Sequence, residues 1–138
     1  MAEVDGYILR IATKEWVDQV FEMAIYYTGF HRKWKVGQII VFVHKTALGD
    51  AFVGYGEIGN VYSLDELSEE ERRECERWGW KEAIEFKYVI RFEKPLPIKE
   101  TFLKGLKIRG RTLHGFPLSR EKLNSIISDA ERLQPKKS

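Results

Sequence analysis

The sequence has 138 residues, a formal net charge of +2 and one cysteine. This length suits a single domain that can bury roughly 68–70% of its unfolded surface, and no apolar run approaches the roughly 20 residues that span a bilayer. One cysteine excludes an internal disulfide, and the first residues lack the basic and apolar regions of a secretion signal. We therefore expect a soluble protein of the reducing cytoplasm.

The first half of the chain predicts a strand, a helix and two further strands. Residues 7–11 form the first strand, and Thr13 caps a helix with one apolar face, which carries Trp16, Val17, Val20, Phe21, Ala24 and Ile25. A Lys-Val-Gly-Gln turn at residues 35–38 leads into the β-branched strand 39–43. In the next strand, residues 52–58, Gly54 and Gly56 should share one face, left bare for a backbone, a ring or a ligand to approach.

The second half predicts a charged helix and one long strand. Ser63 and Glu66 form a Ser-x-x-Glu capping box, so a peripheral helix should run from about Leu64 to Trp78. Residues 84–93 alternate clearly, which predicts one buried face of Ile84, Phe86, Tyr88, Ile90 and Phe92.

The last elements follow two prolines. Pro95 and Pro97 should end the preceding strand, because each lacks an amide donor. We then expect a short helix over residues 98–105, a strand over 107–113, and a final helix. Ser119 should cap that helix, with Leu118 and Leu123 as a hydrophobic staple.

The charges are segregated along the chain. Residues 99–122 carry seven bases and two acids, residues 31–45 carry four bases and no acid, and residues 65–77 carry seven acids and three bases. We therefore expect one basic side. Strands outnumber helices and their connections are short, which predicts an α+β fold built on a small, partly open β-barrel of mostly antiparallel strands.

The Lys-x-Gly turn, the Gly-x-Gly strand and the closing segment 116–133 together resemble the PUA-like superfamily, in particular its EVE and ASCH domains. The resemblance covers nearly the whole chain. It implies one domain, residues 1–138, with a helical insertion at 63–80 over one end of the barrel. Gln38 stands where Asp is usual, and the ASCH signature G-x-K-x-x-E-x-R is absent.

The resemblance implies a binding module for a nucleobase or nucleotide, including modified ones. We expect its partner to be a nucleic acid, RNA in preference to DNA, or a nucleobase-like small molecule, with no cofactor and no membrane. The pocket that it implies lies between the loop before the turn, the end of the next strand and the segment before the last helix. These places hold His31, Trp34, His44, Lys45, Arg111, Thr112, His114 and Phe116.

Other residues are candidates by their own chemistry. Trp78 and Trp80 flank Gly79 and could present two rings to a base, although sealing the rim of the core explains each ring equally well. The candidates for phosphate contacts are Lys35, Arg109, Arg111 and Thr112, which could equally be solvated surface groups. The three histidines have no metal-ligand spacing, so we expect no metal site.

Two alternatives stay open beside the binding module. The first is a nucleoside hydrolase of ASCH type, in which Lys45, Thr46 and Glu57 would take the roles that the resemblance implies. We rank it lower because no catalytic motif stands out. The second is a protein-interaction domain that uses the acidic helix as its contact surface.

Overall fold

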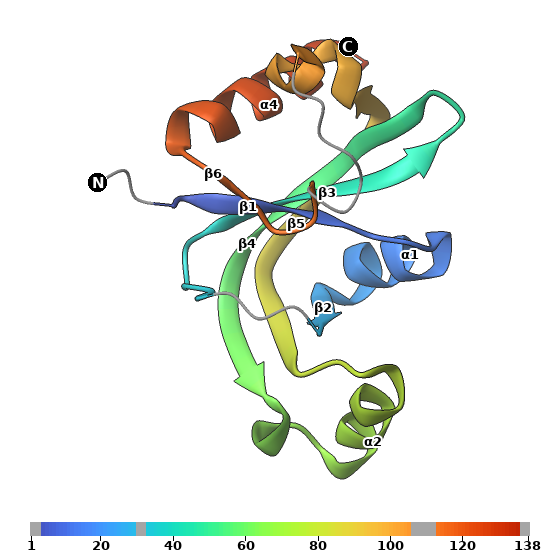
Figure 1. Ribbon diagram of the computed structural model, residues 1–138, viewed down its shortest axis with the longest axis vertical. Helices are drawn as coiled ribbons and strands as arrows, with labels where there is room; N and C mark the ends of the chain where they lie inside the picture. The colour runs from blue at the N-terminus through green and yellow to red at the C-terminus, as the bar shows by residue number, and fades with distance from the viewer. Residues whose placement is uncertain (1–3, 30–32, 106–112, 136–138) are drawn as a thin grey trace.

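The protein is seen here in a computed structural model, which describes residues 4–29, 33–105 and 113–135 (Figure 1). In this part of the chain the strands form one six-stranded sheet in the order β2-β5-β4-β3-β1-β6. The strands are β1 (Gly6–Arg10), β2 (Ile25–Thr28), β3 (Ile39–Thr46), β4 (Gly49–Ser63), β5 (Glu82–Pro97) and β6 (Phe116–Leu118). The α-helices are α1 (Lys14–Met23), α2 (Glu69–Trp78) and α4 (Arg120–Leu133).

The sheet is mixed and strongly curled. Of its described pairings, β1 with β3 is parallel, and the other neighbours are antiparallel. Figure 1 shows α4 above the sheet, α1 at its side, and α2 at the far end of the long β4–β5 ribbon. The expected α+β fold with a partly open, mostly antiparallel barrel is confirmed.

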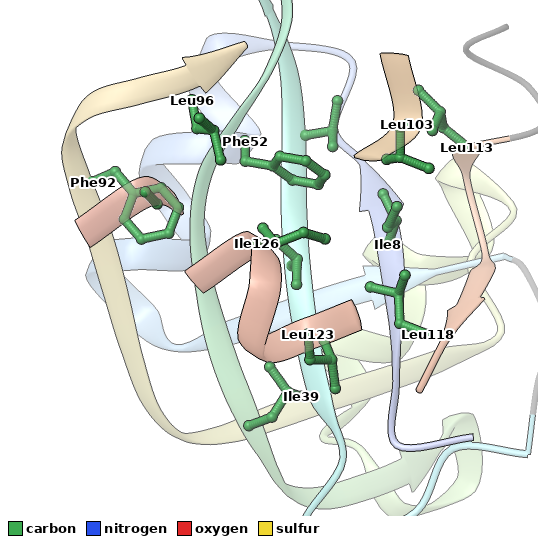
Figure 2. Close-up of a cluster of buried hydrophobic side chains, with 13 residues drawn as sticks. Ile8, Ile39, Phe52, Phe92, Leu96, Leu103, Leu113, Leu118, Leu123 and Ile126 are labelled. Atoms are coloured by element: carbon green, nitrogen blue, oxygen red, sulfur yellow. The ribbon is translucent and has the colours of Figure 1, made fainter. Parts of the chain in front are cut away.

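Two apolar clusters hold the fold together, one on each face of the sheet. Figure 2 shows the first, in which Leu123 and Ile126 of α4 pack over Ile8 and Phe52 of the sheet. Because Leu123 is fully enclosed, truncating it to alanine should cost about 2–5 kcal/mol. The second cluster joins Val17 and Val20 of α1 to the opposite face of the sheet.

Helix α1 begins and ends where its caps place it. The Thr13 hydroxyl accepts a hydrogen bond from the Trp16 amide at 3.2 Å, as the sequence predicts. Ala24 then adopts a left-handed conformation with φ 56°, which stops the helix. Ile25, predicted on the helix face, is instead the first residue of β2, because its strand pairs with β5.

Strand β5 does not bury the single face that its alternation predicts. Tyr88 is 39% and Ile90 43% exposed. The β4–β5 ladder shifts register at three points, so the strand twists along its length. Ile84 and Phe86 therefore pack in the α1 cluster, whereas Phe92 packs in the α4 cluster.

The two prolines do not end β5, so the prediction that the strand stops before them is wrong. The strand continues to Pro97, and Leu96 pairs with Phe52. Strand β2 pairs with β5 only as far as Glu85, so the outer edge of β5 is open at the prolines. Proline is tolerated on such an edge because no ladder hydrogen bond is needed there.

Helix α2 begins five residues later than predicted. The capping box is present, since the Ser63 amide donates to the Glu66 carboxylate at 3.2 Å, but it starts only the 3-10 turn Leu64–Glu66. Leu67 is extended, and Ser68 then caps α2 by accepting from the Glu71 amide at 3.2 Å. The second cap therefore decides where the helix starts.

The segment before the last helix is less regular than predicted. Instead of one short helix, residues 98–105 form two 3-10 turns, Ile98–Glu100 and Phe102–Gly105. The strand expected over residues 107–113 falls mostly outside the described residues. Ser119 caps α4 as predicted, by accepting from the Lys122 amide at 3.3 Å. No helix in the described ranges has both the length and the apolar character to cross a bilayer.

Candidate functional site

A hollow of about 440 Å³ lies where the starts of β1, β3 and α4 meet, and we call it the turn groove. These three starts come together because β1 lies between β3 and β6, and β6 leads directly into α4. The groove is lined by Val4, Asp5, Tyr7, Lys33, Lys35, Val36, Gly37, Gln38 and Arg120.

Gln38 fastens the turn that forms one wall of the groove. Its side-chain oxygen accepts from the Lys35 amide at 2.9 Å, and its side-chain nitrogen donates to the Val4 carbonyl at 3.0 Å. Gly37 supplies the left-handed position, with φ 93°. A carboxylate at position 38 could make the first bond but not the second, since it has no donor.

Tyr7 and Trp34 form an aromatic pair at the groove. Their rings meet edge to face with centroids 5.0 Å apart, and the side chains are 7% and 9% exposed. Tyr7 lines the groove. The Trp34 indole nitrogen is buried and has no hydrogen-bond partner in the described part of the chain. A buried donor without a partner is costly, so an acceptor that reached it would be favoured.

The groove carries a positive charge excess. Among its described lining residues, Lys33, Lys35 and Arg120 stand against one acid, Asp5. Asp5 is engaged with α4, since its Oδ2 accepts from the Arg120 amide at 2.8 Å and its Oδ1 lies 3.9 Å from Arg120 Nη2. The two lysines are therefore the groups best placed to meet an anion.

A second group of predicted site residues lies at the other end of β1 and β3. His44 Nδ1 is 2.8 Å from the Ile11 carbonyl oxygen, and His114 Nδ1 accepts from the Arg10 amide at 3.0 Å. Lys45 is exposed in the same region. At about 3.3 Å per residue, the ends of β3 are roughly 20 Å apart, so these residues do not join Trp34 and Lys35.

Phe116, also predicted in the pocket, packs against the α4 cluster and pairs with Ile8.

Gly54 and Gly56 of β4 lie on a crowded face of the sheet. A Cβ at Gly54 would overlap the Phe21 ring, and one at Gly56 would stand 2.9 Å from the Tyr88 carbonyl oxygen. The predicted close approach is confirmed, with a ring and backbone of the chain itself as the neighbours.

Trp78 and Trp80 lie in a different hollow, of about 800 Å³, which we call the α2 groove. Their rings are stacked with centroids 5.8 Å apart, and Trp16 of α1 meets both edge on, at 5.4 and 5.6 Å. Tyr27 stacks on Trp80 at 5.3 Å. The described lining also includes Glu15, Glu70, Glu71 and Glu74, and no lysine or arginine.

The four remaining predicted residues, His31, Arg109, Arg111 and Thr112, lie outside the described residues. Apart from Gly54, Gly56 and Phe116, which pack against other parts of the chain, the candidates that the structure describes therefore separate into three places: the turn groove, the far ends of β1 and β3, and the α2 groove.

No protein-family model and no curated protein sequence matches this chain. Solved structures match it over nearly its whole length. An ASCH protein from Zymomonas mobilis superposes with a TM-score of 0.68 at 9% identity, over 97% of this chain and 99% of that one. This chain has a PUA-like fold of ASCH type.

Two other matches are more distant in shape. A hypothetical protein from Leishmania major gives a TM-score of 0.60 at 16% identity, over 94% of this chain and 96% of that one. The YTH domain of the Zygosaccharomyces rouxii MRB1 protein, solved in complex with N6-methyladenosine RNA, gives 0.56 at 13% identity, over 100% and 90%. At such low identity the likeness concerns the fold alone.

The hydrolase arrangement implied by the ASCH resemblance does not form in this fold. Lys45 pairs with Asp50 near the tip of the β3–β4 hairpin, whereas Glu57 pairs with Ile39 at its opposite end. These residues are therefore too far apart to share a substrate. In the described part of the chain, no three His, Cys, Asp or Glu side chains gather as metal ligands do.

Sequence reasoning missed several residues of both grooves. The sequence predicts Tyr7 only as a strand residue and Arg120 only as part of a basic stretch. Their position beside Lys35 depends on β1 lying between β3 and β6, which no local pattern indicates. The sequence predicts Trp16 on the apolar face of a helix and does not indicate Tyr27 as a site residue. The local signal for the α2 groove is the Trp78-Gly79-Trp80 run at a predicted helix end.

Proposed function

We propose that this PUA-like domain recognises a nucleobase within single-stranded RNA at the turn groove. The observation that carries the proposal is the convergence of Lys33, Lys35 and Arg120 on one hollow beside the Tyr7–Trp34 pair. Its volume of about 440 Å³ falls within the usual range for small-ligand sites, roughly 300–1,000 Å³.

The groove has separate groups for the phosphate and for the base of a nucleotide. The two lysines would hold phosphates, which position the strand without reading its sequence. Tyr7 lines the groove and would offer its ring edge to a base. The indole N–H of its partner Trp34, which is buried and has no hydrogen-bond partner among the described residues, would be the donor for an acceptor of that base that reached it. RNA is favoured because sequence-specific RNA readers take unstacked bases from single strands.

The YTH domain of similar fold was solved with methylated RNA, which supports RNA as the class of ligand to test first. We include modified bases in the proposal for the same reason.

The role of the two lysines is tested by titrating a labelled single-stranded RNA with the protein at several salt concentrations, with binding measured by fluorescence anisotropy. Replacing Lys33 and Lys35 together with Gln should weaken all RNAs alike and flatten the salt dependence, by about 0.7 in slope per lost phosphate contact. The matched control removes two exposed lysines of β5, Lys87 and Lys94, which do not line the groove. The control should leave affinity and slope close to those of the parent.

The recognition part is tested with Trp34→Phe, which keeps an aromatic ring in the core and removes the indole N–H. Preference among bases should fall while the salt slope stays unchanged, because base contacts and phosphate contacts act separately. The same titration with a DNA strand of equal sequence tests the choice of RNA. A parent protein without affinity for RNA at low salt would end the proposal.

A further inference from the structure

The α2 groove combines exposed aromatic surface with an excess of negative charge: four glutamates line it, of which Glu74 lies 4.0 Å from Arg77 on the same helix. Trp78 is 51% and Met23 56% exposed, and both line the groove. A neighbouring hollow of about 330 Å³, lined in part by Glu66, Glu71 and Glu85, meets it at Glu71. As in the α2 groove, neither lysine nor arginine is among its described lining residues. Apolar surface left exposed beside charges of one sign indicates a binding surface.

The local potential is negative enough to act on neighbouring groups. Tyr27 Oη donates to Glu71 Oε2 at 3.1 Å, and burial followed by the Glu71 charge raises the pKa of Tyr27 to about 12. Burial, together with Glu71, Glu74 and Glu76, also raises the pKa of the Cys75 thiol. An anionic ligand such as a nucleic-acid strand would be repelled here, so this groove is not suited to the ligand proposed for the turn groove.

One face of α2 carries two carboxylates and an indole ring in a row. Glu70, Glu74 and Trp78 are each four residues apart and therefore lie along one side of the helix, about 6 Å from one to the next. The Trp78 indole donates to Glu74 Oε1 at 2.8 Å, which fixes the ring beside the carboxylate. Glu70 and Glu15 have no ion-pair partner in the part of the chain that the structure describes.

We propose that the α2 groove binds an extended segment of a partner protein that carries arginines at alternate positions. A planar guanidinium can stack on an exposed indole and donate to carboxylates at the same time. In an extended segment, alternate side chains on one face are about 6.6 Å apart, close to the spacing of the row on α2. The Trp78 and Trp80 rings are already stacked on each other, so the partner would cover an outer ring face and not enter between them.

The test uses the whole chain and a labelled peptide of alternating arginine and serine, titrated by fluorescence anisotropy. The parent should bind this peptide, and a peptide of alternating glutamate and serine should not bind. Trp78→Ala should weaken binding by about tenfold or more, and Trp78→Phe should restore most of it. Replacing Glu70 and Glu74 together with Gln should weaken binding to a similar extent, although the new amide oxygen at position 74 could still accept from the indole.

The matched control removes the same number of charges from the same helix. Glu69 and Glu76 do not line either hollow, so replacing both with Gln should change the affinity far less than the Glu70 and Glu74 pair does. Circular dichroism of each variant confirms that α2 is retained.

Three outcomes would overturn the proposal. The parent could fail to bind the arginine peptide at low salt, or both glutamate pairs could weaken binding equally, which would reduce the effect to net charge. The third is a dimer that dissociates when Glu70 and Glu74 are replaced, which would assign the groove to a second copy of this chain. None of these outcomes bears on RNA binding at the turn groove, so the two proposals fail separately.

Discussion

Phe21 of α1 lies directly over Gly54 of β4. A methyl group in place of the Gly54 hydrogen would overlap both the Phe21 ring and the Ile90 carbonyl oxygen. The contact explains why this strand, in the middle of the sheet, has no side chain at that position: the helix can seat its ring against the strand only where the strand has no Cβ.

Gly54→Val should therefore destabilise the fold by about 1–3 kcal/mol or more, because the ring could rotate away but the Ile90 carbonyl cannot. The free energy of unfolding in urea measures the effect. Lys87→Val on the neighbouring strand β5 is the control, since Lys87 is exposed, and its change should stay within about 0.5 kcal/mol. A Gly54 variant as stable as the parent would contradict the close approach.

Gln38→Glu should destabilise the turn by about 1–3 kcal/mol, because the carboxylate keeps the Lys35 amide as a donor but leaves the Val4 carbonyl without one. Urea unfolding again gives the measurement. Asn124→Ala, at an exposed position of α4, is the control and should be neutral or slightly stabilising. If Gln38→Glu also leaves RNA affinity unchanged, the turn does not shape the groove.

Residues 64–81 should be dispensable for folding of the barrel. Ser63 pairs directly with Glu82, so an Asn-Gly dipeptide could join β4 to β5 as a two-residue hairpin. The shortened chain should be less stable, because Trp16 and Tyr27 lose their ring contacts, yet it should still melt cooperatively by circular dichroism. It should also keep RNA affinity and lose affinity for the arginine peptide. A chain without a cooperative transition would show that α2 is integral to the core.

Stability should fall steeply at alkaline pH. Burial raises the pKa of Tyr26 and of Tyr27 to about 12, whereas both ionise near 10 in the unfolded chain. Between these values the unfolded chain has lost protons that the folded chain keeps. The contribution of the two tyrosines is therefore fully present below about pH 10 and is lost as the pH rises towards 12.

Thermal melting at several pH values across this range checks the expectation, with tyrosinate absorbance followed in parallel. Tyr26→Phe should make the loss of stability less steep. Full ionisation of both tyrosines near pH 10 in a chain that is still folded would contradict it.

The parts of the fold that the sequence predicts well depend on neighbours a few residues away. Thr13 and Ser119 cap the helices that they were expected to cap, and Gly37 takes the left-handed position of the predicted turn. Ser68 shows the limit of such reasoning, because two competing caps, Ser63 and Ser68, both fit the sequence and only one begins α2.

By itself, the sequence determined the fold class, the caps and turns, and the separation of basic from acidic segments, because these follow from local propensity and from charge along the chain. Only the tertiary structure decided which of those residues share a site. Arg120 meets Lys35 because β1 lies between β3 and β6, and Trp78 meets Trp16 because the connection between β4 and β5 brings its ring to α1. Such meetings depend on strand order and register, which join residues far apart in the chain and leave no local pattern to read.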